Sequence, residues 1–246
     1  GQNEVCFLYT GALRSADNLN TFKSTVKAIA ARNGLFASFM PKPLADQPGS
    51  GLHVNISLLR DGKNLFEGEL APGSEGAHFV AGVLAHAREL TAFCNPVPNS
   101  YARLGANEAP LYVSWSRQNR SQLVRLPSAR GELCRVELRG PDPAGNPYLV
   151  IGLILAAGLD GIQRELPLPE AVNRNLFLPS AAAGLECLPR TLREAITVAA
   201  QSEFISRELP IALQNKYFQY QTLLCHGFES APDPEAWDRA NGFLII

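Results

Sequence analysis

Two short segments with alternating polar and apolar residues carry the side chains best suited to chemistry. Segment 52–58 would bury its apolar residues on one face of a β-strand and present on the other the polar set His53, Asn55 and Ser57. Segment 133–139 alternates in the same way, and its polar set is Arg135, Glu137 and Arg139. Three charges on one strand face are costly to bury unless they are paired or bind a ligand. Either segment alone could be an ordinary half-exposed strand, but together they predict the floor of a polar site.

More guanidinium groups precede the second segment. Residues 117–127 contain Arg117, Arg120 and Arg125, and guanidinium groups keep their charge while binding phosphate or carboxylate through paired hydrogen bonds. One histidine, one glutamate and this arginine cluster indicate a site for a divalent cation and an anionic, phosphorylated ligand. For any single arginine the alternative is a surface ion pair, which contributes about 0–1 kcal/mol to stability.

The composition narrows the class of protein. The 246 residues suffice for one large domain or two small ones. A net charge of −1 and a pI of about 6.5 predict no nucleic-acid partner and no membrane-surface partner. No apolar run reaches the roughly 18–20 residues of a membrane span. Five cysteines without CxxC spacing favour reduced thiols in a cytoplasmic protein over disulfides or a zinc site.

Strands are expected wherever short apolar or alternating runs are bounded by turn residues. The expected strands are 4–10, 35–40, 52–58, 111–116, 123–126 and 133–139. Asp61-Gly62 predicts a hairpin turn after the third of these strands.

Helices are expected where apolar residues recur with helical spacing. The expected helices are 17–33, 75–94, 147–164, 191–200 and 210–224. In the first, Ser15 or Asp17 would cap the helix, Gly34 would end it, and an apolar stripe would belong to the core. The helix over 147–164 is apolar enough to lie under a sheet, and segment 226–246 is expected to be irregular, with Trp237 and Phe243 as anchors. His78 and His86, both on the helix over 75–94, are expected to be surface or packing residues, not catalytic ones.

Several motifs, in a fixed order along the chain, together resemble glutamine synthetase of the bacterial class I type. They are Met40-Pro41-Lys42-Pro43, Gly49-Ser50-Gly51-Leu52-His53, Asn95-Pro96, Asn99-Ser100-Tyr101, Arg103-Leu104, Glu108-Ala109-Pro110, Asn119-Arg120-Ser121, Val136-Glu137-Leu138-Arg139, Pro141-Asp142-Pro143 and Asn146-Pro147-Tyr148. The resemblance implies an α+β fold in which a mainly antiparallel, curved sheet is packed by helices, as in the glutamine synthetase/guanido kinase-like catalytic domain. Residues 1–246 would form this domain without its N-terminal β-grasp domain and first metal-binding strand.

The resemblance also implies an activity. Glutamine synthetase is an ATP-dependent glutamate–ammonia ligase that makes glutamine through a γ-glutamyl phosphate intermediate, and it uses Mg²⁺ or Mn²⁺. Its partners would be glutamate, ammonia, ATP and further copies of the subunit, with a dodecamer expected for the full-length cytoplasmic protein. The 246-residue chain itself is expected to be inactive, because it would be a fragment of the active site.

Individual roles follow from the positions that match the family motifs. The expected metal ligands are Glu4, His53 and Glu137. The expected ATP-binding residues are Asn55, Ser57, Arg120, Arg125, Arg130 and Arg135. The expected glutamate-binding residues are Gly49, Arg103, Glu108 and Arg139. Glu108, on a flap, would take a proton from the attacking ammonium, and Arg120 would stabilise charge in the transition state.

The sequence departs from the family pattern at four places. Pro48 stands where an asparagine usually faces the substrate, and Asn107 replaces an aromatic residue in a flap that is one residue short. Asn55 stands where a second histidine is common, and Phe177 falls near a tyrosine that some members modify with AMP. The first two changes leave open a γ-glutamyl ligase that uses a larger amine or a polyamine.

A catalytically silent member kept for binding or assembly is a further alternative. It is disfavoured because a scaffold needs none of the four residues His53, Glu108, Arg120 and Glu137.

Overall fold

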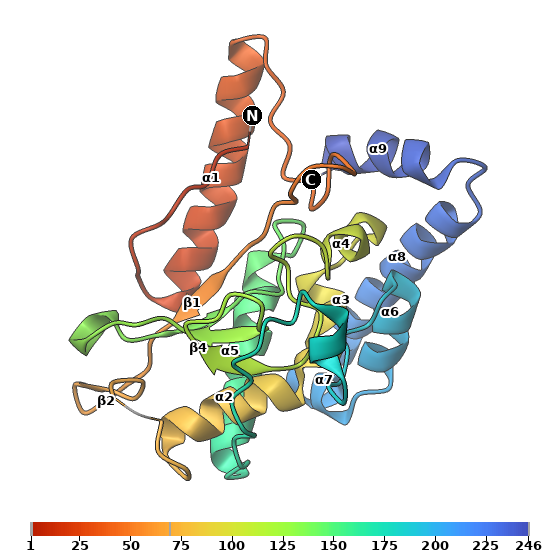
Figure 1. Cartoon of the computed structure of the whole chain (residues 1–246). Coiled ribbons are helices and arrows are strands. Elements are labelled where there is room, and N and C mark those ends of the chain that lie inside the picture. Colours follow the sequence, from red (N-terminus) through yellow and green to blue (C-terminus); the bar gives the residue numbers. More distant parts are fainter. Residues whose placement is uncertain (1, 69, 246) are drawn as a thin grey trace.

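A four-stranded sheet of order β1-β6-β5-β4 lies at the centre of the computed structural model, which describes residues 2–68 and 70–245 (Figure 1). Its strands are β1 (Val54–Ile56), β4 (Trp115–Arg117), β5 (Val124–Leu126) and β6 (Val136–Leu138). The predicted alternation holds in β1, where Val54 and Ile56 are buried and Asn55 is exposed. The sheet therefore turns an apolar face to the core and keeps polar side chains on the other face of β1.

The sheet is antiparallel except at one edge. Strand β6 pairs antiparallel with β1 and with β5, so that Asn55 and Arg125 both lie opposite Glu137. Strands β4 and β5 run parallel, with Trp115 opposite Val124. The expected fold, a mainly antiparallel sheet packed by helices, is confirmed, but the sequence pattern did not indicate this parallel edge.

The predicted hairpin turn is also confirmed. Strands β2 (Leu59–Arg60) and β3 (Lys63–Asn64) pair antiparallel, with Arg60 opposite Lys63. The two residues between them, Asp61 and Gly62, have φ angles of 51° and 76°. Two consecutive positive φ angles are those of a type I′ turn, whose twist matches that of the strands it joins.

Three apolar helices complete the core with the sheet. They are α2 (Glu75–Ala85), α3 (Ala87–Cys94) and α5 (Pro147–Gln163). Phe79 of α2 and Ile154 of α5 belong to the same buried cluster as Val136 of β6. The helix expected over 147–164 is confirmed, whereas the helix expected over 75–94 is broken, because His86 ends α2 and begins α3.

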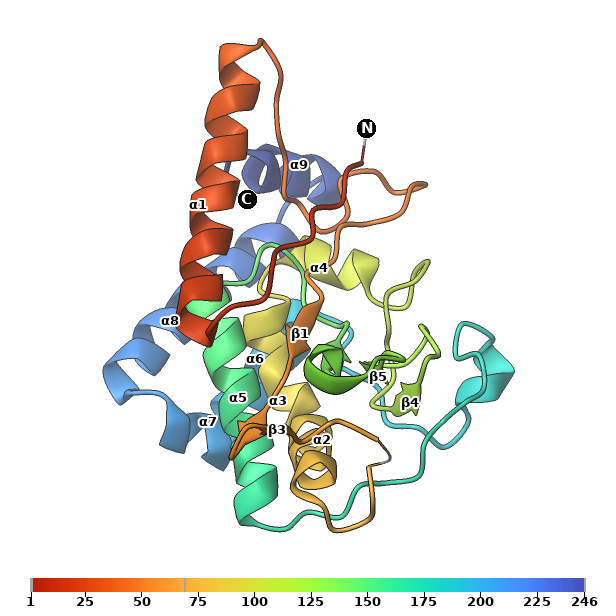
Figure 2. The same cartoon turned by 90° about the vertical axis from the view of Figure 1, so that its left-hand side faces the viewer.

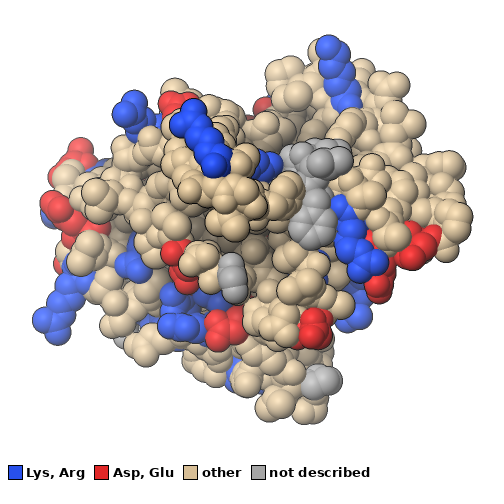
Figure 3. All heavy atoms as spheres, turned by 90° about the horizontal axis from the view of Figure 1, so that it is seen from above, with Lys and Arg blue, Asp and Glu red and all other residues tan. Residues whose placement is uncertain are grey.

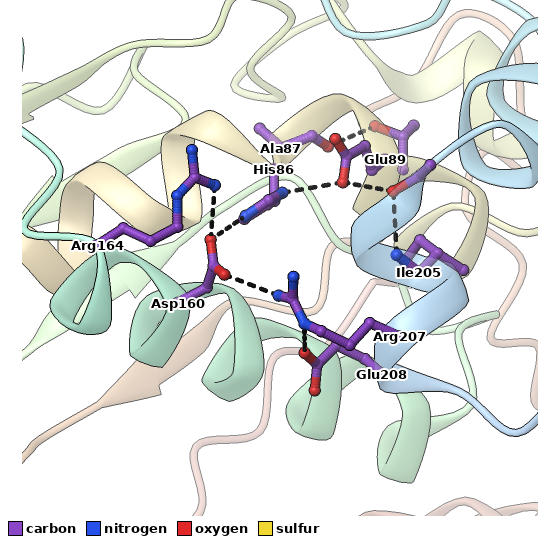
Figure 4. Close-up of polar contacts among 10 residues, drawn as sticks. His86, Ala87, Glu89, Asp160, Arg164, Ile205, Arg207 and Glu208 are labelled. Carbon is purple, nitrogen blue, oxygen red and sulfur yellow. Dashed lines mark hydrogen bonds and ion pairs between the residues drawn. The ribbon is translucent and has the colours of Figure 1, made fainter.

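A buried ionic cluster surrounds this break and joins four helices (Figure 4). The His86 imidazole contacts Glu89 Oε2 through Nδ1 at 2.9 Å and Asp160 Oδ2 through Nε2 at 2.8 Å. Its ring stacks on Phe204 at a centroid distance of 3.9 Å. The two carboxylates also accept hydrogen bonds from Ser202, Arg164 and Arg207. The expectation that His86 is a packing residue is therefore confirmed, and His78 is half-buried with Nδ1 2.8 Å from the carbonyl oxygen of Leu166.

The remaining helices form the C-terminal half and one short connection. They are α4 (Pro98–Arg103), α6 (Leu192–Ala200), α7 (Glu203–Glu208), α8 (Ile211–Glu229) and α9 (Pro234–Ile245), with 3₁₀ turns η1 (Gly131–Leu133) and η2 (Pro179–Ala182). The expectation of an irregular end over 226–246 was wrong, because Asp233 accepts a hydrogen bond from the Ala236 amide and starts α9. Trp237 packs edge-on against Phe228, as an anchor should, whereas the side chain of Phe243 lies outside the described part of the chain.

Helix α1 (Ala12–Arg32) extends beyond the rest of the molecule, with the N-terminal segment running alongside it (Figure 2). It begins earlier than predicted, at Gly11, without a side-chain cap from Ser15 or Asp17, and it ends just before Gly34 as expected. The predicted core stripe is only half-buried in this helix: Phe22 packs against Phe7 and Phe39, but Ile29 is exposed, and the fully buried residue is Ala16. The strands expected at 4–10 and 35–40 are also wrong, because neither segment pairs with the sheet.

The surface mixes charges of both signs. On the face shown in Figure 3, lysine and arginine side chains are interspersed with aspartate and glutamate, and uncharged atoms cover most of the area. Among the described residues, every helix is too short or too polar to cross a membrane.

Candidate active site

The two predicted polar segments meet at His53 and Glu137. Because β1 and β6 are neighbours with Val54 opposite Leu138, His53 at the start of β1 reaches the carboxylate on β6. His53 Nδ1 lies 3.5 Å from Glu137 Oε1, and the two side chains are 34% and 7% exposed. An imidazole edge open to solvent therefore faces a nearly buried carboxylate.

Two arginines hold the other oxygen of Glu137. Its Oε2 accepts hydrogen bonds from Arg125 Nε at 2.6 Å and from Arg139 Nη1 at 3.2 Å. Burial alone would raise the pKa of Glu137, but hydrogen bonds from His53 and Arg125 and the charges of Arg125 and Arg139 lower it well below its usual value. The carboxylate is therefore ionised, with Oε1 directed at His53 and available to a cation.

The predicted flap residue Glu108 faces two of the predicted arginines. Its Oε2 lies 4.0 Å from both Arg120 Nη1 and Arg139 Nη2, and its side chain is 68% exposed. The flap turns tightly, with positive φ angles of 78° at Gly105 and 51° at Asn107. Asparagine tolerates this left-handed conformation better than bulky residues do, so Asn107 suits this turn.

Arg103 lies beneath the glycine segment that leads into β1. Its guanidinium is buried and donates to the carbonyl oxygens of Gly140 at 2.8 Å and Arg139 at 3.2 Å. A Cβ atom on Gly51 would lie 2.5 Å from Arg103 Nη2, and one on Gly49 would lie 3.1 Å from Arg103 Cγ. The predicted substrate residues Gly49, Arg103 and Arg139 are therefore packed into one unit, which requires glycine at both positions.

The predicted nucleotide residues occupy the outer part of the same strands. Arg135 Nε donates to Asn55 Oδ1 at 2.9 Å, across the β1–β6 pair. Ser57 donates its hydroxyl to the Cys134 carbonyl oxygen at 2.8 Å, so that it also ties the two strands together. Arg130 is exposed just before η1.

Glu4 is not brought to the His53–Glu137 pair. Its carboxylate is exposed and lies 3.9 Å from Cys6 Sγ, and within residues 2–68 and 70–245 no group of three or more His, Cys, Asp or Glu side chains is placed to hold a metal ion. The ionised carboxylate of the pair nevertheless suits a divalent cation such as Mg²⁺ or Mn²⁺, whose remaining positions water and phosphate oxygens would fill, with His53 as an additional nitrogen donor.

Sequence reasoning missed the polar residues that support these arginines. Asn95 donates to the Gly140 carbonyl oxygen, at 3.0 Å, next to the bond from Arg103. Gln122 and Ser121 are buried beside Arg120 and bond to the loop over residues 172–176. The available signal was the run Asn119-Arg120-Ser121-Gln122, since four polar residues between two apolar strands must find partners.

Comparisons with known proteins identify the family. The model of the glutamine synthetase catalytic domain matches residues 1–240. Glutamine synthetases of Staphylococcus epidermidis (strain ATCC 35984) and Staphylococcus aureus (strain MW2) are each 43% identical over 231 residues, which cover 91% of this chain and 52% of theirs. The chain thus spans about half the length of these relatives.

Solved structures give the same result. The structure named "GmaS/ADP complex-Conformation 1" matches with a TM-score of 0.83 at 34% identity, covering 95% of this chain and 55% of its own. The one named "Apo GmaS without ligand" matches with a TM-score of 0.82, also at 34% identity, covering 94% of this chain and 54% of its own. Together with the geometry of the site, these matches show that the chain belongs to the glutamine synthetase family and carries its catalytic domain.

Proposed function

We propose that the whole protein is an ATP-dependent glutamate–ammonia ligase. It would transfer the γ-phosphoryl group of ATP to the side-chain carboxylate of glutamate, after which ammonia displaces phosphate and leaves glutamine. The single observation that carries this proposal is the ionised Glu137, which faces His53 on one oxygen and two arginines on the other. Phosphoryl transfer needs this combination of a cation site and fixed guanidinium groups, since its catalysis consists of positioning and charge stabilisation.

His53 and Glu137 would hold a Mg²⁺ or Mn²⁺ ion, and by family resemblance Glu4 would bind a second one. When bound, such an ion neutralises charge on the phosphate oxygens and orients the transferred group. The chemistry of the pair supports this assignment. The Glu137 carboxylate is kept ionised, and its two arginine hydrogen bonds both go to Oε2, which leaves Oε1 for the cation.

The arginines divide into two groups by their surroundings. Arg125 and Arg135, with Asn55 and Ser57 beside them and Arg130 nearby in sequence, would bind the nucleotide. The proposal is supported by the structural relative described as an ADP complex. Arg120 is 65% exposed next to the flap and would contact the transferring phosphoryl group, where charge develops.

The glutamate end would lie over the buried unit of Gly49, Arg103 and Arg139. Glu108 would close over it and take a proton from the ammonium ion. Its position between Arg120 and Arg139 supports this role, since Glu108 Oε2 lies 4.0 Å from a guanidinium nitrogen of each and therefore next to the arginines proposed to contact the phosphoryl group and glutamate. A closed flap also keeps water from the acyl phosphate.

A ligase that joins glutamate to a larger amine is a second candidate. Two observations favour it: Pro48 is exposed at the entrance to the glycine segment, and Asn107 lacks the side-chain bulk of the aromatic residue usual in the flap. Both changes affect the amino-acid end and leave the nucleotide end intact. We further propose a cytoplasmic homo-oligomer for either activity.

An amine panel on the whole protein separates the two candidates. Phosphate release is measured with glutamate, ATP and Mg²⁺ while ammonia, methylamine, ethylamine and a polyamine are each supplied over the same concentrations. Ammonia should give the highest kcat/KM if the protein makes glutamine. A higher kcat/KM with any alkylamine or polyamine transfers the assignment to the second candidate, and release that no amine stimulates would refute both.

A further inference from the structure

The loop that carries Arg120 is unusually short for its place in the fold. It joins the parallel strands β4 and β5 with residues 118–123 only, although parallel neighbours usually need a crossover of a dozen or more residues. Gln118 at its start has a φ angle of 70°, in the left-handed region. Backbone bonds hold the two ends of the loop, from the Gln118 amide to Leu126 and from the Arg139 amide to Leu123, while the residues around Arg120 are held mainly by side-chain hydrogen bonds.

Three side chains of this loop bond to the backbone of residues 172–176. Gln122 has no exposed surface, and its amide donates to the carbonyl oxygens of Val172 and, at 3.0 Å, Arg174. Ser121 Oγ, also buried, accepts a hydrogen bond from the Leu176 amide at 3.0 Å. The Asn119 amide donates to the carbonyl oxygens of Asn173 and Arg174 at 3.0 and 3.1 Å.

The same three side chains also bond to one another. The Ser121 hydroxyl lies 2.9 Å from Asn119 Oδ1 and 2.5 Å from Gln122 Oε1, and the backbone amide of Ser121 also donates to Asn119 Oδ1 at 3.0 Å. The loop and segment 172–176 are therefore joined on both sides of Arg120. Because such a network is buried, losing one member leaves the others without partners.

Arg120 itself has little that could fix it. Its side chain is 65% exposed, and its nearest charged partner is Glu108 at 4.0 Å. Arg139, by contrast, is 3% exposed and bonds directly to Glu137. An exposed arginine keeps its long side chain mobile, so the placement of its guanidinium depends on the backbone beneath it.

We propose that Gln122 is a positioning residue for Arg120, acting with Ser121 and Asn119 to lock the Arg120 loop onto the backbone of residues 172–176. The inference rests on the proposed function, in which Arg120 stabilises the transition state. It adds that segment 172–176, which contacts no reacting atom in this assignment, governs the turnover rate through these hydrogen bonds.

Turnover of the whole protein gives the first test, with Gln122→Met as the variant and Gln214→Met as its matched control. Gln214 is likewise buried and likewise donates to two backbone carbonyl oxygens, those of Ser206 and Leu209, but it lies on α8. In Gln122→Met, kcat should fall about 10- to 100-fold, more than KM for glutamate or ATP changes, because a displaced group loses transition-state contacts first. Gln214→Met should keep kcat within about twofold of the wild type, since Gln214 bonds to Ser206 and Leu209 and not to the Arg120 loop. A Ser121→Ala variant should lower kcat in the same direction.

Hydrogen exchange of the 246-residue chain gives a readout that needs no activity. In Gln122→Met, amides of 118–123 and 172–177 should exchange faster together, whereas Gln214→Met should speed exchange only around 206–214. Equal kcat in the two methionine variants, or faster exchange in only one of the two Gln122-linked segments, would overturn the inference. Absence of wild-type ligase turnover would instead refute the proposed function, and exchange would still decide whether Gln122 fixes the loop.

Discussion

The two carboxylate oxygens of Glu137 have different partners: Oε1 faces His53, and Oε2 accepts hydrogen bonds from arginines. Arg125 and Arg139 both bond to Oε2, so their charges keep the carboxylate ionised without occupying Oε1. An aspartate would be one methylene shorter, and a glutamine could keep one acceptor oxygen for the arginines but would present an uncharged NH₂ donor toward His53. The residue therefore links the cation site and the guanidinium groups electrostatically.

Replacement of Glu137 by glutamine tests this link. Removal of the negative charge should weaken Mn²⁺ binding by the whole protein by at least about 10-fold, since even residues outside the immediate ligands cost 10–100-fold. Isothermal titration with Mn²⁺ in the presence of ADP measures the change. Glu229→Gln serves as the control, because Glu229 pairs with Arg193 on the exposed surface of α8. Equal Mn²⁺ affinity in Glu137→Gln and wild type would rule out Glu137 as a ligand.

At the scale of elements, the contact between α2 and α5 depends on small residues. A Cβ atom on Gly82 would lie 2.7 Å from Gly161 Cα, and one on Gly161 would lie 2.6 Å from Gly82 Cα. Real Cβ atoms do not approach backbone this closely, so the two helices touch through their main chains. Both helices line the core under β6, and their spacing therefore affects the strand that carries Glu137.

Alanine substitutions should distinguish the steric cost of a methyl group at the α2–α5 contact from the gain in helix propensity that alanine brings at an open position. Gly82→Ala and Gly161→Ala should each lower the free energy of unfolding by about 1–3 kcal/mol, because the added methyl group forces the helices apart. Gly152→Ala, on the exposed side of α5 with open space around it, should raise it by about 0.5–1 kcal/mol, since glycine is a poor helix former. Urea unfolding followed by circular dichroism measures all three. Stabilisation by either of the first two variants would contradict the close helix contact.

The His86 cluster also holds helices together, but unlike the glycine contact between α2 and α5 its contribution to stability depends on pH. Burial lowers the pKa of His86, but hydrogen bonds from the imidazole to Glu89 and Asp160 and the charges of these carboxylates outweigh burial and raise the pKa overall. In the same cluster the pKa values of Glu89 and Asp160 are lowered: burial raises them, and the contacts with His86, Ser202 and Arg164 outweigh it. Arg207 from α7 also faces Asp160, at 2.7 Å. A protonated His86 therefore holds α3, α5 and α7 together.

This arrangement predicts that stability falls in alkaline solution. Because the folded pKa of His86 lies above its unfolded value of about 6.5, its contribution is complete below that pH and is lost as pH rises through the folded pKa. Urea midpoints of the 246-residue chain at pH 6, 7, 8 and 9 should decline more steeply for the wild type than for His86→Gln. His226→Gln, at an exposed position of α8, should follow the wild-type slope. Parallel curves for wild type and His86→Gln would show that the cluster does not depend on protonation.

At the scale of the whole molecule, sequence patterns predicted elements well where the chain supplies its own partners. The strand over 52–58 and the helix over 147–164 have an apolar face that this chain covers. The strand prediction failed for 4–10, where Leu8 and Tyr9 are largely exposed. The apolar stripe of α1 is only half-covered, with Phe22 packed against Phe7 and Phe39 but Ile29 exposed. Alternation and periodicity report which face would be buried, but not whether a partner lies beside it.

The candidate site likewise has features that the sequence could predict and features that it could not. The pairing of His53 with Glu137 could be expected, because two strands with polar faces at matching positions meet in one sheet. The parallel β4–β5 edge could not, because a six-residue connection normally indicates an antiparallel hairpin, whereas Trp115 pairs in parallel with Val124. The Gln122 network could not either, because it joins segments about 50 residues apart, as from Gln122 to Val172. Short-range patterns carry no information on such pairings. The roles assigned to these residues remain predictions that the variants above test.

The proposed cation site leads to a prediction for the 246-residue chain. Among the described residues His53 and Glu137 stand without a third ligand of the His, Cys, Asp or Glu type, and the chain spans about half the length of its relatives. If the remaining ligands and substrate contacts come from the other half of the whole protein, the purified 246-residue chain should turn over at least about 100-fold more slowly than the whole protein. Phosphate release with glutamate, ammonia, ATP and Mg²⁺ measures both, after circular dichroism has shown that the chain is folded. Turnover by the folded chain at the rate of the whole protein would mean that these residues suffice for catalysis.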